Sequence, residues 1–202
     1  MEDICLAILC GGQSNRFRSN KSLAEFHEEP LISHMIGIAR KTSNSVFVVV
    51  SNNEQKQQIQ PLIGNVPTVL DPKGYPSCPL TASLAAFKAC QKQFCHLLPI
   101  DTPLLKPALV ELVLKLHNNH DAVVPRWSSG YIEPLHSLYK TASAIPAAKK
   151  LLASRSLKMR NLVNALEDVL FISVEILRQV DPYLDSFKNA NTREELRQLE
   201  KQ

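Results

Sequence analysis

Short apolar runs alternate with longer segments of mixed apolar and polar residues along this chain. The runs at residues 4–9 and 46–50 contain no charged residue, and the second is almost entirely valine. Uninterrupted runs of this length are typical of strands that are buried on both faces of a sheet. We expect strands at residues 4–9, 46–50, 68–70, 96–100, 122–125 and 169–174.

The segments between these runs have the length and spacing of amphipathic helices. We expect helices at residues 31–41, 55–61, 80–91, 107–118, 142–153 and 158–166, and a last one from about residue 193. Asn191 or Thr192, followed by Glu194 and Glu195, has the composition of a helix N-terminus. Strands that alternate with helices predict an α/β protein whose mainly parallel sheet carries helices on both faces.

One segment departs from this alternation. Residues 131–139 look like an extended insertion, and Pro134 argues against a central strand there because proline cannot donate to a sheet ladder. The chain contains no internal repeat and no long linker. We therefore expect a single domain over residues 1–202.

Composition narrows the class of protein. Of the 202 residues 45 % are hydrophobic, which suits one well-buried domain, and the longest apolar runs are far too short to span a bilayer. Glu2 and Asp3 stand where a signal peptide would be basic, so we expect a cytoplasmic protein. The net charge of +4 is scattered along the chain, which argues for neither nucleic-acid nor membrane binding and suits a small anionic substrate.

Five cysteines form an odd set without a Cys-x-x-Cys pair. Their spacing fits neither a zinc site nor a disulfide framework. We expect Cys5, Cys90 and Cys95 to be core residues, and Cys10 and Cys78 to be exposed thiols in loops.

Chemistry concentrates where the first apolar run ends. Gly11 and Gly12 follow the run, and Arg16, Arg18 and Lys21 come next. Glycine allows close approach to the backbone, and exposed N–H groups with nearby cations form a cradle for a polyphosphate. The alternative is an ordinary turn with solvated basic residues. The loop matches neither a Walker A sequence nor the dinucleotide-binding fingerprint.

Two aspartates follow predicted strands. Asp101 stands beyond residues 96–100, where the carboxyl ends of parallel strands bind ligands, and its carboxylate suits Mg²⁺. It could instead cap a helix opened by a proline. Asp71 precedes a proline and has a glycine nearby, which is also ordinary turn chemistry.

The opening loop resembles the signature of the molybdenum cofactor guanylyltransferase family, which has a Rossmann-like nucleotidyltransferase fold with three α/β/α layers. The residues that fall into the family pattern Leu-x-Gly-Gly-x-Ser-x-Arg-Met-Gly-x-Asp-Lys are Leu9, Gly11, Gly12, Ser14, Arg16 and Lys21. Phe17, Arg18 and Asn20 replace the usual Met, Gly and Asp. The family segment Gly-Pro-Leu-Ala-Gly is replaced by Cys-Pro-Leu-Thr-Ala at residues 78–82, without either glycine.

The resemblance implies roles for particular residues. Asp101, in Pro-x-Asp-x-Pro, would bind Mg²⁺, and Asp71 would contact the nucleotide. The resemblance places Leu9, Cys10 and Gly11 against the base, and the Gly-Gly pair resembles the guanylyl branch rather than the cytidylyl branch. Further residues implied by the family segments are Ser51 (where Asn52 or Asn53 could substitute), Asn189 and Asn191 near the metal and the pterin, and residues 134–139 along the acceptor pocket.

The implied reaction transfers GMP from GTP to the terminal phosphate of molybdopterin and releases pyrophosphate. Lys21 would neutralise the non-bridging oxygens, and Arg16 would hold the β- and γ-phosphates. We expect a monomer or weak oligomer with transient contacts to proteins of molybdoenzyme maturation. The alternatives are a related nucleotidyltransferase that uses CTP or a sugar phosphate, and a catalytically weakened nucleotide-binding protein.

Overall fold

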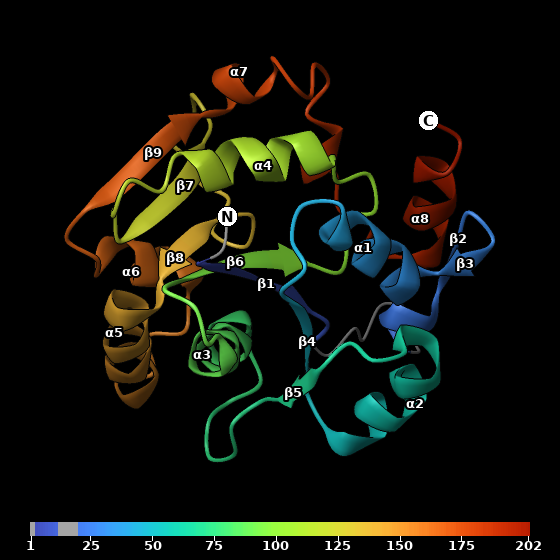
Figure 1. Cartoon of the computed structure of the whole chain (residues 1–202), viewed down its shortest axis with the longest axis horizontal. Helices are drawn as coiled ribbons and strands as arrows, with labels where there is room; N and C mark the ends of the chain where they lie inside the picture. Colours follow the sequence, from blue (N-terminus) through green and yellow to red (C-terminus); the bar gives the residue numbers. More distant parts are fainter. Residues whose placement is uncertain (1–2, 12–19) are drawn as a thin grey trace.

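A seven-stranded sheet forms the centre of the protein, as a computed structural model describes it for residues 3–11 and 20–202 (Figure 1). The strands lie in the order β5-β4-β1-β6-β8-β7-β9, and every neighbouring pair is parallel except the two that involve β8. Their bounds are β1 Ile4–Leu9, β4 Val46–Val50, β5 Thr68–Leu70, β6 Phe94–Pro99, β7 Ala122–Arg126, β8 Leu138–Lys140 and β9 Val169–Ser173. The expected mainly parallel α/β fold is confirmed.

Helices cover both faces of this sheet. Two separate apolar clusters fill the space between the sheet and the helices, one packed against α1, α2 and α4 and the other against α3, α5 and α6 (Figure 1). The helices are α1 Leu31–Arg40, α2 Asn53–Ile63, α3 Pro79–Ala89, α4 Pro107–Lys115, α5 Thr141–Ala153, α6 Met159–Asn164, α7 Val174–Leu177 and α8 Arg193–Leu199. The smaller elements are the 3₁₀ turns η1 Lys21–Leu23 and η2 Asp185–Phe187, and the hairpin strands β2 Glu25–Phe26 and β3 Glu29–Pro30.

Strand β1 explains why the sheet needs helices on both sides. Its residues alternate between the two apolar clusters, so that Leu6 and Ile8 face one layer while Ala7 and Leu9 face the other. All six residues of β1 are buried. A strand without a polar face is stable only in the interior of a sheet that is covered twice.

The segment at residues 131–139 differs from the sequence-based expectation. Its last residues enter β8, which lies between β6 and β7 and runs antiparallel to both. The expectation that Pro134 rules out a central strand was wrong because Pro134 precedes the strand and needs no ladder donor. Its carbonyl instead accepts a 2.7 Å hydrogen bond from the buried Tyr139 hydroxyl.

Polar side chains cap the N-termini of α2 and α8. At α8 the Thr192 side chain accepts from the Glu195 N–H and Glu195 bonds back, which completes the capping box that the sequence suggests. At α2 the side chain of Asn52 accepts from the Gln55 N–H at 2.8 Å, so the helix begins two residues before the expected start. These caps matter because α2 and the segment before α8 both border the site described next.

The cysteines are distributed differently from the expectation. Cys5 and Cys95 are core residues as expected, but Cys90 is only partly buried. Cys10 is 6 % exposed, so the expected exposed thiol is wrong, and burial raises its pKa to about 12. Cys78 is half-buried at the start of α3. Among the described residues, none of the helices is both long and apolar enough to cross a bilayer.

Candidate active site

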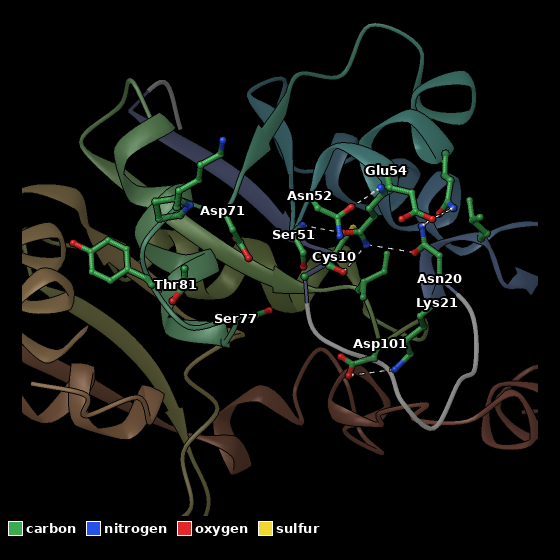
Figure 2. A pocket seen from close by; sticks show the side chains of 18 of the residues that line it. Cys10, Asn20, Lys21, Ser51, Asn52, Glu54, Asp71, Ser77, Thr81 and Asp101 are labelled. Carbon is green, nitrogen blue, oxygen red and sulfur yellow. Dashed lines mark hydrogen bonds and ion pairs between the residues drawn. The ribbon is translucent and has the colours of Figure 1, made fainter. Parts of the chain in front are cut away.

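A pocket of about 910 Å³ opens at the carboxyl ends of β1, β4, β5 and β6 (Figure 2). Open parallel sheets bind their ligands at this edge because the strand-to-helix loops meet there. The lining residues are Cys10, Gly11, Asn20, Lys21, Leu23, Ser51, Asn52, Glu54, Gln55, Gln58, Asp71, Pro72, Lys73, Tyr75, Ser77, Thr81, Ile100, Asp101 and Asn191.

Gly11 lines the pocket beside Ser51 and Asp71. A Cβ atom added to it would stand 3.0 Å from the Ser51 Oγ and 3.4 Å from the Asp71 Oδ2. A side chain at this position would therefore crowd Ser51. Because glycine has no side chain, its backbone stays uncovered on the side that faces the pocket.

Asp71 presents a carboxylate with unusual properties to this space. It follows β5, and its own N–H bonds to the Val50 carbonyl at 2.9 Å. Its Oδ1 is buried and has no hydrogen-bond partner among the described residues. Burial raises the Asp71 pKa to about 6, because a carboxylate removed from water is harder to ionise. A ligand that donates a hydrogen bond here would stabilise the ionised form.

Lys21 and Asp101 form an ion pair in the same pocket. The Lys21 Nζ stands 3.4 Å from the Asp101 Oδ2. A dashed line marks this ion pair in Figure 2. Lys21 belongs to η1 and Asp101 follows β6, so the pair joins segments that are 80 residues apart. Burial lowers the Lys21 pKa, and the Asp101 carboxylate partly opposes that effect. The pair places one cation and one carboxylate beside Gly11 and the end of β1.

The C-terminal segment closes the pocket beside this pair. The Ala190 N–H donates to the Asp101 carbonyl at 2.8 Å, and Ala190 itself is buried in the core. Asn191 lines the pocket, whereas Asn189 is exposed and is not among the lining residues. Of the two predicted amides, only that of Asn191 therefore belongs to a residue that lines the pocket.

The start of α3 supplies the remaining wall. Cys78 has an extended backbone at φ −158°, which any residue adopts, and Ala82 lies inside the helix. The Ala82 methyl would be 3.9 Å from a Cβ on Gly11, an ordinary contact distance. The two missing family glycines therefore leave this wall undistorted. Thr81 faces the cavity and donates to the Pro76 carbonyl at 2.7 Å.

The structure brings together most of the predicted site residues. Cys10, Gly11, Lys21, Ser51, Asp71, Asp101 and Asn191 all line the pocket. Leu9 is a buried core residue of β1 and does not line it. Gly12 and Arg16 lie outside the described residues.

Comparison with known proteins assigns the chain to a family. The sequence profile of the MobA-like NTP transferase domain matches residues 6–169. The chain belongs to that family. It is 26 % identical over 201 residues to the probable molybdenum cofactor guanylyltransferase of Methanosarcina mazei, covering 95 % of this chain and 88 % of that protein.

Two further comparisons agree with this assignment. The probable molybdenum cofactor guanylyltransferase of Pyrococcus horikoshii is 29 % identical over 192 residues, which cover 94 % of this chain and 95 % of that protein. The crystal structure of molybdopterin-guanine dinucleotide biosynthesis protein A from Archaeoglobus fulgidus has the same fold, with a TM-score of 0.84 at 23 % identity over 97 % of this chain and 96 % of that chain. The resemblance seen in the opening loop is thus confirmed.

A nucleotidyltransferase of this kind is expected to use a divalent cation, and the donor set fits one. Within residues 3–11 and 20–202 no cluster of three or more His, Cys, Asp or Glu could hold a metal ion. Mg²⁺ seldom needs such a cluster, because it commonly binds one or two carboxylates together with substrate phosphates and water. The Asp101 carboxylate, with its side chain 27 % exposed, suits that mode.

Sequence reasoning missed several residues of the nucleotidyltransferase pocket. Gln55 and Gln58 on α2 line it, as do Lys73 and Tyr75 after β5. Asn52 and Gln55 stand at N-cap spacing, which indicates a helix start but not that the Gln55 side chain lines the pocket.

Residues expected to line an acceptor pocket lie elsewhere. None of residues 131–139 is among those that line this pocket in the described chain. His136 is buried, not a surface residue, and it packs edge-on against Phe187 at 5.2 Å between ring centroids. Burial lowers the His136 pKa to about 3, with His96 adding to the effect, so the ring is neutral at physiological pH.

Proposed function

We propose that the protein transfers GMP from GTP to the terminal phosphate of molybdopterin and releases pyrophosphate. The observation that carries this proposal is the Lys21–Asp101 pair, 3.4 Å apart, beside the open backbone of Gly11 at the end of β1. Membership of the MobA-like family and relatives named as guanylyltransferases support it.

The chain's own residues supply binding and charge. The base approaches the uncovered backbone of Gly11, and the Asp71 carboxylate in the same pocket accepts a hydrogen bond from a ligand N–H or O–H. The Lys21 ammonium neutralises non-bridging oxygens of the α-phosphate, and Arg16 remains a predicted partner of the β- and γ-phosphates. Mg²⁺, held by Asp101, would draw charge from the leaving group.

The reaction needs no covalent intermediate on the enzyme. An oxygen of the acceptor phosphate attacks the α-phosphorus of GTP, the bond to the β-phosphate oxygen breaks, and pyrophosphate leaves with that electron pair. Catalysis of this kind consists mainly of positioning and charge neutralisation. A pocket whose Lys21 ammonium pairs with the Asp101 carboxylate suits that chemistry.

Calorimetry on the purified protein tests the first step. We expect GTP with Mg²⁺ to bind more tightly than CTP or ATP, and the binding to weaken in Lys21→Ala. A preference for CTP would move the protein to the cytidylyl branch. GTP binding without pyrophosphate release in the presence of molybdopterin would favour the weakened nucleotide-binding protein instead.

Other features of the proposal follow from the reaction. GTP and molybdopterin are the substrates, and a protein of molybdoenzyme maturation is the expected recipient of the product. The cytoplasm is the expected compartment, and a monomer or weak oligomer is the expected state.

A further inference from the structure

The side chain of Gln55 makes three contacts, all with residues that line the pocket. The Ser51 backbone N–H donates to the Gln55 Oε1 at 2.9 Å, and the Gln55 Nε2 donates to the Cys10 carbonyl at 2.9 Å. The same nitrogen lies 3.4 Å from the Asn20 Oδ1, next to Lys21 in the chain. One amide therefore links the ends of β1 and β4 to the residue that precedes η1.

These contacts replace a rung of the sheet ladder. The Cys10 N–H donates to the Val49 carbonyl at 2.9 Å, which continues the parallel pairing of β1 with β4. In a regular parallel ladder the next bond would run from the Ser51 N–H to the Cys10 carbonyl. Both of these groups bond to the Gln55 amide instead. The amide thus spaces the two strands apart at the mouth of the pocket.

A primary amide suits this insertion. The site needs one acceptor for the Ser51 N–H and two donors for the oxygens of Cys10 and Asn20, and a primary amide offers both kinds of atom. The Ser51 N–H also fixes which way the amide points. Gln55 is held in place by the first turn of α2, where its own N–H bonds to Asn52.

The spacing matters because Gly11 directly follows Cys10. The Cβ position of Gly11 is already 3.0 Å from the Ser51 Oγ. If β1 and β4 paired by one more rung, the ends of both strands would shift, and Ser51 would be pressed against Gly11. Both residues line the pocket, so the shift would change the surface that a base meets there.

We infer that Gln55 is a positioning residue for base recognition: its amide is inserted between Cys10 and Ser51 and fixes where the Gly11 backbone and the Ser51 side chain stand in the pocket. This inference rests on the proposed function, because it concerns how the same pocket takes a guanine nucleotide. It predicts an unusual combination of effects. Without Gln55 the ladder between β1 and β4 gains one rung, so the free energy of unfolding changes little. Nucleotide binding, in contrast, becomes weaker.

The test compares the wild type, Gln55→Ala and the control Gln57→Ala by calorimetry with GTP and with CTP, each with Mg²⁺. Gln57 is an exposed residue on the same helix and does not line the pocket. We expect Gln55→Ala to weaken GTP binding by about 10- to 100-fold, since the hydrogen bonds that hold Cys10 and Ser51 in position are lost and the pocket surface beside them shifts. We also expect it to lose most of the preference for GTP over CTP, with Gln57→Ala unchanged.

The outcomes separate this inference from the proposed function. If the wild type binds no nucleotide, the proposed function fails and the inference falls with it. If the wild type prefers GTP but folded Gln55→Ala binds GTP within about twofold of the wild type, Gln55 has no positioning role. An equal loss for GTP and CTP would also overturn it. Should Gln55→Ala not fold, Gln55→Met keeps the length of the side chain and is judged by the same criteria.

Discussion

Two sets of polar groups in the pocket differ in how their hydrogen-bonding capacity is satisfied. The amide cluster, which consists of Cys10, Asn20, Ser51 and Gln55, is linked by hydrogen bonds of 2.9 to 3.4 Å. The charged set consists of Lys21, Asp71 and Asp101. Its ion pair is long at 3.4 Å, and one Asp71 oxygen has no partner in the part of the chain that is described.

The amide cluster therefore determines the shape of the pocket, and the charged set determines its chemistry. Neutral hydrogen bonds with good geometry hold backbone segments at fixed distances without a large desolvation cost. Charges that are partly buried and loosely held cost free energy in the absence of a ligand, and a ligand of opposite character recovers it. We therefore expect changes in the charged set to alter turnover and metal response, and changes in the amide cluster to alter recognition.

Removing the cation should have the largest effect. Lys21→Ala eliminates transition-state charge neutralisation, so we expect kcat for GMP transfer to fall by about 100- to 1,000-fold. The melting temperature of the variant is measured alongside to show that it is folded. Steady-state kinetics measure the loss, with exposed Lys88→Ala on α3 as the matched control. Turnover close to that of the wild type would remove Lys21 from the mechanism.

The second-largest effect should be a changed response to the metal when the Asp101 carboxylate is neutralised. Asp101→Asn keeps the shape of the side chain and removes its charge, so the Mg²⁺ concentration for half-maximal activity should rise by about 10- to 100-fold. A magnesium titration of activity, carried out at saturating GTP, measures this shift. An unchanged titration curve would mean that Asp101 does not hold the metal.

The pH dependence of Asp71 should give a smaller but distinctive effect. Burial raises its pKa to about 6, so the carboxyl is neutral below that pH and ionised above it. Only the ionised form accepts hydrogen bonds at both oxygens, so GTP affinity should rise by up to about tenfold between about pH 5 and 7. Calorimetry at a series of pH values measures it. In Asp71→Asn the part of the pH dependence of GTP affinity that is due to Asp71 should be absent.

The same shift has a consequence for stability with a fixed sign. A carboxyl with a raised folded-state pKa costs stability when it is ionised, and the cost is relieved as pH falls through about 6 toward the ordinary 3.8. Asp71→Asn should therefore raise the melting temperature of the ligand-free protein at pH 8. A lower melting temperature would show that Asp71 supports the fold instead of straining it.

Much of the fold was predictable because its central strands are buried on both faces. Residues 4–9 and 46–50 have no polar position, so no other placement suits them, and the structure confirms both strands with the same bounds. The β8 strand was missed because three residues, Leu138–Lys140, carry too little pattern for a periodicity to show. Its place between β6 and β7 depends on partners distant in sequence.

The candidate site was predictable to a similar degree. Asp71, Asp101 and Ser51 could be located because each follows a predicted strand, and such ends meet at one edge of the sheet. Gln55 could not be located in this way, because the sequence alone predicts that a polar residue on a helix is exposed to solvent. Its partners Cys10 and Asn20 are 45 and 35 residues away. Cys10 follows β1 directly, and nothing in its neighbours shows that it is buried.

The most direct test of the account is GMP transfer itself. Purified protein is incubated with Mg²⁺, molybdopterin and GTP labelled at the α-phosphate, and the products are identified by mass spectrometry. The account predicts a molybdopterin-guanine dinucleotide that carries the label and forms in a one-to-one ratio with pyrophosphate, with Lys21→Ala nearly inactive. Binding of GTP without labelled dinucleotide, or transfer from CTP in preference to GTP, would contradict it.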